Sequence, residues 1–318
     1  MRHNPLVSVV VITYNSATTV LETLESIKRQ TYPNIEVILS DDGSTDNTVD
    51  IADKWINENK HYFVRSVIKT STTNTGTTKN CNRGVKSANG EFIKLIAGDD
   101  LLLSNCIEDL IEYCVKHNAQ VAFSKVQIKA ETESMKIEKT RGHECLFIDF
   151  FESSSERQRL EFLKGFKVGF YLIGAIFTKT IYDVVGGFDE NYKMMEDYPF
   201  YFRISWSGYK LPLLDKYTAI YRVRGSQNAQ NFQKSRRYLE WYENLERFEK
   251  KEIFPRMRER KMFFSIYDLY IRRTCRMLQC HYASKSLLFV SKLVLLLSPL
   301  FIFTQLRLFV KIIAKKQI

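Results

Sequence analysis

Short apolar runs alternate with amphipathic stretches along the first hundred residues of the chain. Residues Leu6–Tyr14 are rich in valine and apolar on both faces, which is typical of a strand buried in a parallel sheet. The next stretch, residues 18–31, carries its apolar side chains at helical spacing. Strand and helix patterns then continue to alternate over residues 34–48, 48–60, 62–70, 74–89 and 91–97. This order predicts an α/β fold with a mostly parallel, doubly wound sheet, helices on both faces and right-handed crossovers.

The pattern changes in the second half of the chain. A polar, weakly patterned stretch over about residues 129–160 predicts a variable insertion or loop, and ordered patterns return over residues 169–209. Residues 233–282 are helical in pattern and rich in aromatic and basic side chains. We therefore expect one main domain over residues 1–230, a helical extension over 231–284 and a separate tail over 285–318.

The distribution of charge narrows the choice of partners. The 318-residue chain has a formal net charge of +11, and residues 251–318 hold 14 basic and 3 acidic residues, so the whole excess lies there. A nucleic-acid enzyme usually carries basic residues around its active site, so we expect no nucleic-acid partner. A basic tail that is also apolar indicates an anionic membrane surface instead.

The tail is too interrupted to predict a membrane-spanning helix. Its longest window without charge, Leu293–Leu306, has 14 residues, whereas a spanning helix needs about 20 apolar residues. We expect an interfacial amphipathic or re-entrant segment attached to the membrane, with a true span or a soluble packing or oligomer helix as the alternatives. The six cysteines form no C-x-x-C pair and the first residues lack a signal-peptide pattern, which favours the cytoplasm, with the protein peripheral on the cytoplasmic face of the membrane.

Polar side chains gather where the predicted strands end. The set is Thr13, Tyr14 and Asn15 after the first strand, Asp41 and Asp42 after the second, and Asp99 and Asp100 after the strand at 91–97. Any one cluster has a plainer explanation, an Asx turn with a helix cap or a solvated turn. Ligands of open parallel sheets bind at the carboxyl ends of the strands, and a divalent cation bound to phosphate would relieve the repulsion among the carboxylates. Glycine-rich dinucleotide and P-loop motifs and zinc motifs are absent from the sequence.

Three stretches, Val7–Thr48, Asn74–Asp100 and Val185–Ile204, resemble the family 2 glycosyltransferases of the GT-A fold in sequence, order and spacing. The resemblance covers about residues 5–225. It implies a GT-A glycosyltransferase domain, a nucleotide-sugar donor and a divalent cation, Mn²⁺ or Mg²⁺, as cofactor.

The resemblance also implies roles for individual residues. Thr13 and Tyr14, followed by Asn15, match the first-strand residues that cradle the nucleotide base, and one of Asp41 and Asp42 matches the residue that hydrogen-bonds uracil. Asp99 and Asp100 match the end of the family's D-x-D, which holds the ribose and the metal. Asp197 matches the catalytic base, with Glu196 beside it. The implied donor site is completed by Gly76, Lys79, Asn82 and Arg83.

The chain departs from the family pattern at several positions. Ala97 replaces the first carboxylate of D-x-D-D, so Asp100 is the preferred metal ligand and Asp99 the second. Relatives often carry Arg-Asn-x-Gly where this chain has Cys81–Gly84, so the cation facing the phosphates must be Lys79 or Arg83, with Lys79 favoured.

Two later motifs are less specific. Arg224 stands where a histidine is common, on the phosphate or acceptor side. Gly187 and Phe188 belong to a turn that is either near the acceptor and donor sugar or simply structural.

These residues predict an in-line displacement that inverts the anomeric centre. The Glu196–Asp197 pair alone would also suit the acidic start of a helix. The predicted acceptor is a hydroxyl of a glycan or lipid-linked molecule in cell-surface polysaccharide synthesis, and the predicted donor is a UDP-sugar. Two alternatives remain, a noncatalytic sugar-nucleotide-binding or scaffold protein and a nucleotidyltransferase.

Overall fold

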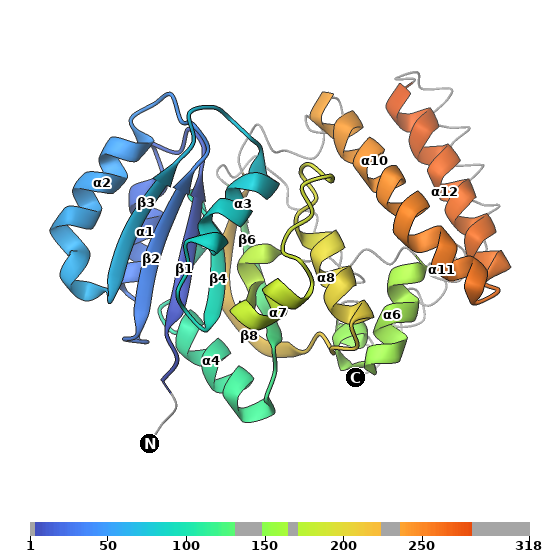
Figure 1. Cartoon of the computed structure of the whole chain (residues 1–318), viewed down its shortest axis with the longest axis horizontal. Helices are drawn as coiled ribbons and strands as arrows, with labels where there is room; N and C mark the ends of the chain where they lie inside the picture. The colour runs from blue at the N-terminus through green and yellow to red at the C-terminus, as the bar shows by residue number, and fades with distance from the viewer. Residues whose placement is uncertain (1–3, 131–147, 165–170, 224–235, 282–318) are drawn as a thin grey trace. The chain divides into compact units, whose positions relative to one another are not determined.

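The computed structural model describes residues 4–130, 148–164, 171–223 and 236–281. These residues belong to two compact units (Figure 1). The first unit contains residues 4–130 and 171–223, and the second contains residues 148–164 and 236–281. Arg224 and the predicted tail, residues 285–318, lie outside the described residues.

The first unit is built on one mixed sheet of eight strands in the order β3-β2-β1-β4-β7-β6-β8-β5. The strands are β1 (Val7–Thr13), β2 (Ile35–Asp41), β3 (Arg65–Thr70), β4 (Phe92–Ala97), β5 (Leu101–Leu102), β6 (Val121–Ala130), β7 (Ala175–Thr178) and β8 (Leu213–Val223). The predicted α/β fold class is confirmed, with the four strands of the first hundred residues parallel to one another.

The order of the strands fixes where a ligand can bind. The chain passes from β1 to β2 and β3 on one side and then returns to β4 on the other side of β1. This reversal makes the carboxyl ends of β1 and β4 the topological switch point of the sheet. Gly98 permits the close approach there, because a Cβ at this position would lie 2.7 Å from Cγ2 of Thr13.

Helices cover both faces of this sheet, as expected from the alternating apolar positions (Figure 1). They are α1 (Val20–Lys28), α2 (Thr48–Asn59), α3 (Thr77–Lys86), α4 (Cys106–His117), α7 (Lys179–Val184) and α8 (Asp197–Trp206), with 3₁₀ turns η1 (Lys60–Tyr62) and η2 (Leu172–Gly174). The buried residues Val7, Val9 and Val11 of β1 join the core formed with α1, α2 and α4. Val10 points to the opposite face and meets α3 at Gly84.

The second unit is helical. Its elements are α6 (Ser155–Leu163), α10 (Arg236–Phe248), the π-helical turn η4 (Glu249–Ile253), α11 (Phe254–Glu259) and α12 (Phe263–His281). Within the stretch predicted as a variable insertion or loop, about residues 129–160, α6 begins at Ser155 with the Ser154 side chain as its N-cap. Few apolar positions mark this helix, and it is held mainly by Phe162 and Leu163, which are buried. The boundaries predicted at residues 230 and 284 stay predictions.

Across the described ranges, no helix combines the length and apolar character required to cross a bilayer.

Candidate functional site

The turn after β2 is held by the carboxylate of Asp41. Its Oδ1 accepts hydrogen bonds from the Thr13 hydroxyl at 2.8 Å and from the Ser44 hydroxyl at 2.5 Å, and its Oδ2 accepts one from the Ser44 main-chain N–H at 2.8 Å. Gly43 allows this turn because its φ is +75° and a Cβ would lie 2.8 Å from the carbonyl carbon of Thr73. Asp41 therefore joins the ends of β1 and β2 into one rigid edge.

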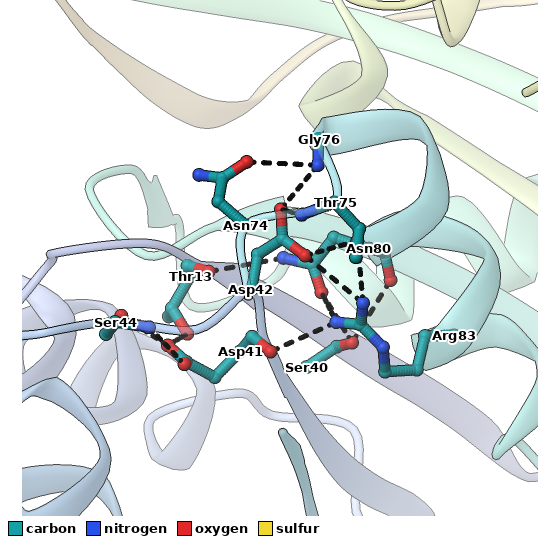
Figure 2. Close-up of polar contacts among 10 residues, drawn as sticks. All are labelled: Thr13, Ser40, Asp41, Asp42, Ser44, Asn74, Thr75, Gly76, Asn80 and Arg83. Atoms are coloured by element: carbon teal, nitrogen blue, oxygen red, sulfur yellow. Dashed lines mark hydrogen bonds and ion pairs between the residues drawn. The ribbon is translucent and has the colours of Figure 1, made fainter. Parts of the chain in front are cut away.

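Asp42, which is almost fully buried, is the centre of a second network (Figure 2). Its Oδ2 accepts hydrogen bonds from the main-chain N–H groups of Thr75 at 3.0 Å and Gly76 at 2.7 Å. Its Oδ1 accepts one from the Thr75 hydroxyl at 2.5 Å and forms an ion pair with Nη2 of Arg83 at 3.1 Å. Both oxygens are occupied, so this carboxylate anchors the loop before α3.

Arg83 is engaged in the same network and not directed toward solvent. Its Nη1 donates to the Asp41 carbonyl at 3.0 Å and to Asn80 Oδ1 at 2.9 Å, and its Nη2 also donates to the Thr75 hydroxyl at 2.8 Å (Figure 2). Four of the five guanidinium N–H groups are thus used within the protein. Lys79, on the first turn of α3, is exposed and has no ion-pair partner among the described residues. The geometry favours Lys79 as the cation available to a ligand.

Asn82 also turns inward. Its Nδ2 donates to the carbonyl of Phe188 at 2.9 Å, and its Oδ1 accepts from the Phe188 N–H at 3.0 Å and from the Tyr182 hydroxyl at 2.6 Å. The turn that contains Gly187 and Phe188 is therefore fastened to α3. A surface pocket of about 520 Å³ lies beside this turn, and none of the strand-end carboxylates lines it.

The remaining residues predicted for the base-binding part lie at the same edge. Tyr14 is 48% exposed directly after β1. Asn15 adopts a left-handed conformation with φ of +51°, and its Oδ1 accepts from the Thr45 N–H at 2.9 Å. The exposed tyrosine ring is a flat surface on which a planar base can stack.

The Asp99–Asp100 turn follows β4 at the switch point, and a residue missed by the sequence analysis closes over it. Arg222 of β8 donates its main-chain N–H to Asp100 Oδ1 at 2.9 Å and its Nε to the Asp99 carbonyl. Its Nη1 pairs with Glu22 of α1. The available signal was a basic residue directly after the apolar run Ala219–Tyr221, but β8 reaches this turn only through the tertiary fold.

The carboxylate oxygens of this turn are suitable ligands for a hard divalent cation that is also coordinated by a bound ligand. Mg²⁺ and similar ions are commonly bound by one or two carboxylates, with phosphate oxygens and water in the other positions. Asp99 and Asp100 supply two carboxylates, and the described residues contain no cluster of three or more metal-binding side chains. A cation here would depend on the diphosphate of a bound ligand for its remaining contacts.

A second acidic pair stands at the start of α8. Burial and the charge of Asp197 raise the pKa of Glu196 to about 7, and burial raises the pKa of Asp197 to about 6. Glu196 Oε2 is buried without a hydrogen-bond partner, while Asp197 Oδ1 accepts from the Tyr198 N–H at 2.6 Å. Two adjacent carboxyls that hold a proton near neutral pH are suited to acid–base chemistry.

Both acidic pairs lie near two tyrosines of the first unit. The charges of Asp100, Asp99 and Glu196 all act, after burial, to raise the pKa of Tyr221. The charge of Asp197 acts in the same way on Tyr171, and the rings of Tyr171 and Tyr221 lie 5.3 Å apart.

The thiol of Cys81 in α3 shows that Asp42, from the first acidic cluster, lies near the Glu196–Asp197 pair. After burial, Glu196, Asp197 and Asp42 all act to raise the pKa of this thiol. The three carboxylate clusters predicted from the sequence therefore lie around one region of the first unit. Arg224 lies outside the described residues, so its predicted role is not addressed by the structure.

Comparison with known proteins gives consistent results. The family model described as "Glycosyl transferase family 2" matches residues 8–183. Glycosyltransferase GlyG of Streptococcus pneumoniae is 37% identical over 116 residues, which is 36% of this chain and 37% of GlyG. The poly(ribitol-phosphate) beta-N-acetylglucosaminyltransferase TarS of Staphylococcus aureus is 32% identical over 122 residues, 38% of this chain and 21% of TarS. The matched stretch thus spans well under half the length of these relatives.

The fold of this chain is also similar to that of solved glycosyltransferase structures. TarS residues 1–349 in complex with UDP-GlcNAc superpose with a TM-score of 0.54 at 22% identity, covering 75% of this chain and 64% of that one. The mannosyltransferase PcManGT of Pyrobaculum calidifontis, in complex with GDP-Man and Mn²⁺, gives a TM-score of 0.61 at 17% identity, covering 79% of this chain and 66% of that one.

Proposed function

The chain belongs to glycosyl transferase family 2, and we propose that it transfers a sugar from a nucleotide diphosphate sugar to a hydroxyl group of an acceptor, with inversion at the anomeric carbon. The observation that carries this proposal is that two acidic clusters, Asp99–Asp100 and Glu196–Asp197, both lie near one pair of tyrosine rings that contact each other. One cluster suits the diphosphate and the other suits the attacking hydroxyl.

The base is assigned to Asp197. An acceptor hydroxyl attacks well only when its proton is removed during the reaction, and a carboxylate with a raised pKa is a stronger base than an ordinary one. Burial raises the pKa of Asp197 to about 6, so this group is largely ionised at neutral pH and still basic enough to accept a proton. Glu196 keeps its proton to higher pH than Asp197, so as pH rises the pair passes through a state with one negative charge.

We assign the stabilisation of the leaving diphosphate to the Asp99–Asp100 cluster. Breaking the anomeric bond places negative charge on the diphosphate, and fixed positive groups stabilise that charge. Asp100, with Asp99, would hold a Mn²⁺ or Mg²⁺ ion, which when bound supplies this positive charge next to the phosphates. Lys79, exposed on the first turn of α3, provides a cation of the chain itself, and Arg222 keeps the Asp99–Asp100 turn in place.

The donor nucleotide is proposed to be UDP. The exposed ring of Tyr14 and the rigid edge built by Thr13 and Asp41 would form the base site. In support, the TarS structures with similar folds contain UDP-GlcNAc and UDP. The acceptor is proposed to be a glycan or lipid-linked molecule used in polysaccharide synthesis, reached by a protein bound to the cytoplasmic face of the membrane through its basic tail.

A donor screen tests this function without knowledge of the acceptor. The full chain is incubated with UDP-, GDP- and dTDP-sugars, with and without Mn²⁺, and release of the nucleoside diphosphate is measured. We expect release from a UDP-sugar that requires the metal and is lost with Asp100→Asn but kept with Asp50→Asn, a control on the exposed side of α2.

The outcome separates the alternatives. A scaffold protein would bind the donor without releasing a diphosphate, and a nucleotidyltransferase would instead consume a nucleoside triphosphate and release pyrophosphate. Either result would overturn the proposal.

A further inference from the structure

Helices α11 and α12 of the second unit meet at a corner (Figure 1). An unusual group of aromatic side chains is exposed at this corner. Phe263 is 67% exposed and Phe264 is 83% exposed, and Tyr267 and Tyr270 are about half exposed. Four large side chains within eight residues thus face solvent at the start of one helix. Single exposed apolar residues are ordinary on a protein surface, whereas a contiguous group of them marks an interaction surface.

Phe263, Phe264 and Tyr267 are not part of the core that holds α12. Over residues 263–275 of the helix, Asp268, Leu269 and Cys275 are buried. Tyr270 stacks on Phe254 of α11 at 5.0 Å, which fixes the angle of the corner. Phe263 and Phe264 lie at the apex, so folding of the helices does not require two phenylalanines there.

The turn itself carries a charge where glycine would be expected. α11 ends in a Schellman-type cap, in which the Met262 N–H donates to the Met257 carbonyl at 2.9 Å and the Lys261 N–H to the Arg258 carbonyl at 3.0 Å. Lys261 occupies the left-handed position of this cap with φ of +54°. Glycine adopts that conformation without strain, so a lysine at this position carries some conformational cost.

Positive charge surrounds the aromatic residues. Residues 256–264 contain four basic residues and one acidic residue. Arg258 and Lys261 are exposed, and neither forms an ion pair with another described residue. The same corner begins the part of the chain, residues 251–318, that holds its whole excess of charge.

We propose that this corner, residues 258–270, binds the surface of a bilayer that contains anionic lipids. Phenylalanine side chains would enter the boundary between headgroups and acyl chains, the two tyrosines would lie at headgroup level, and Arg258 and Lys261 would attract the lipid phosphates. A second copy of the chain would present the same positive charge to this corner, so the charge favours an anionic surface over self-association. The surface is separate from the proposed catalytic residues, which all belong to the first unit.

The first test measures binding of the full chain to vesicles. Sedimentation is compared for vesicles of phosphatidylcholine alone and of phosphatidylcholine with an equal amount of phosphatidylglycerol. The double variant Phe263→Ser, Phe264→Ser should have a partition coefficient on the anionic vesicles that is lower by about tenfold or more, because both substitutions remove apolar side-chain area that would be buried in the bilayer. The matched control, Tyr62→Ser with Val64→Ser, removes two exposed apolar residues from the first unit and should bind normally.

Charge reversal and a fluorescent probe complete the test. Arg258→Glu with Lys261→Glu should weaken binding to the anionic vesicles and leave the weak binding to phosphatidylcholine unchanged. Tryptophan in place of Phe264 should be quenched by brominated lipids, whereas tryptophan in place of Val64 should not.

Three results would overturn the proposal. In the first, the double serine variant binds vesicles as well as the unaltered chain does. In the second, the unaltered chain does not bind vesicles. In the third, the double serine variant loses self-association and not vesicle binding, which would assign the corner to a second copy of the chain. Diphosphate release from the donor without vesicles should be the same in all these variants, so failure of the proposed enzyme activity would be seen independently.

Discussion

Replacing Asp42 by asparagine tests whether this residue holds the fold or contacts the nucleotide. Its carboxylate accepts four interactions, two from main-chain N–H groups, one from the Thr75 hydroxyl and one from Arg83. An asparagine amide keeps one oxygen and presents an NH₂ group to the donors on the other side. Two donors therefore lose their acceptor, and Arg83 loses the charge it is paired with.

The structure gives the expected magnitude. The Asp42 side chain is 3% exposed and that of Arg83 is 23% exposed, so little solvent is available to replace the lost contacts. Removing one partner of a buried ion pair typically costs about 3–5 kcal/mol. Since about 1 kcal/mol shifts the melting temperature of a domain of this size by about 2–4 °C, we expect a decrease on the order of 10 °C.

Thermal unfolding followed by circular dichroism measures this decrease, and calorimetry with UDP measures binding at a temperature where the variant is folded. The control Asp50→Asn removes an exposed carboxylate from the first turn of α2 and should cost less than about 1 kcal/mol. In a double-mutant cycle, Arg83→Met combined with Asp42→Asn should destabilise by less than the sum of the two single changes. An Asp42→Asn variant with an unchanged melting temperature and lost UDP binding would refute the reasoning and make Asp42 a ligand-binding residue.

Three further predictions concern the proposed site. Asp197→Asn should lower transfer by at least about a thousandfold, with donor binding changed only a few-fold, and normal turnover would remove Asp197 as the base. In the unaltered chain the rate should rise as pH increases through about 6 and then level off, because Asp197 must lose its proton to act, and a rate that falls over this range in initial-rate assays would contradict the assignment. Arg222→Gln should weaken UDP binding in the presence of Mn²⁺ more than in its absence, since it loosens the Asp99–Asp100 turn, and calorimetry that shows equal losses would reject this positioning role.

Proton linkage at Glu196 gives a separate prediction for stability. Its pKa is raised in the folded chain above the ordinary value for an unfolded one, so the folded state holds the proton more tightly and stability decreases as pH rises between about 4 and 7. Glu196→Gln removes this decrease in stability, because glutamine does not ionise. The variant should melt at a higher temperature than the unaltered chain at about pH 8 and show little difference at about pH 4, and the same difference at both pH values would contradict the raised pKa.

The sequence by itself determined the first part of the fold and the family. Apolar runs such as Leu6–Tyr14 are buried on both faces only within a sheet that is covered on both sides, so the pattern specified parallel strands with helices between them. Since carboxyl ends of parallel strands meet at one edge, the positions of Asp41, Asp42, Asp99 and Asp100 after their strands already indicated one site. The glycosyltransferase motifs agreed with that edge, and the family expected from them is confirmed.

Tertiary structure decided which of these groups are available to a ligand. Sequence position does not distinguish Arg83, whose guanidinium bonds to Asp41, Asp42 and Asn80, from Lys79, which stays exposed. Nor does it show that Arg222 lies on the Asp99–Asp100 turn, because their contact joins strands that are more than a hundred residues apart. Local pattern fixes which side chains follow a strand, whereas hydrogen bonds between distant segments fix which of them remain free to do chemistry.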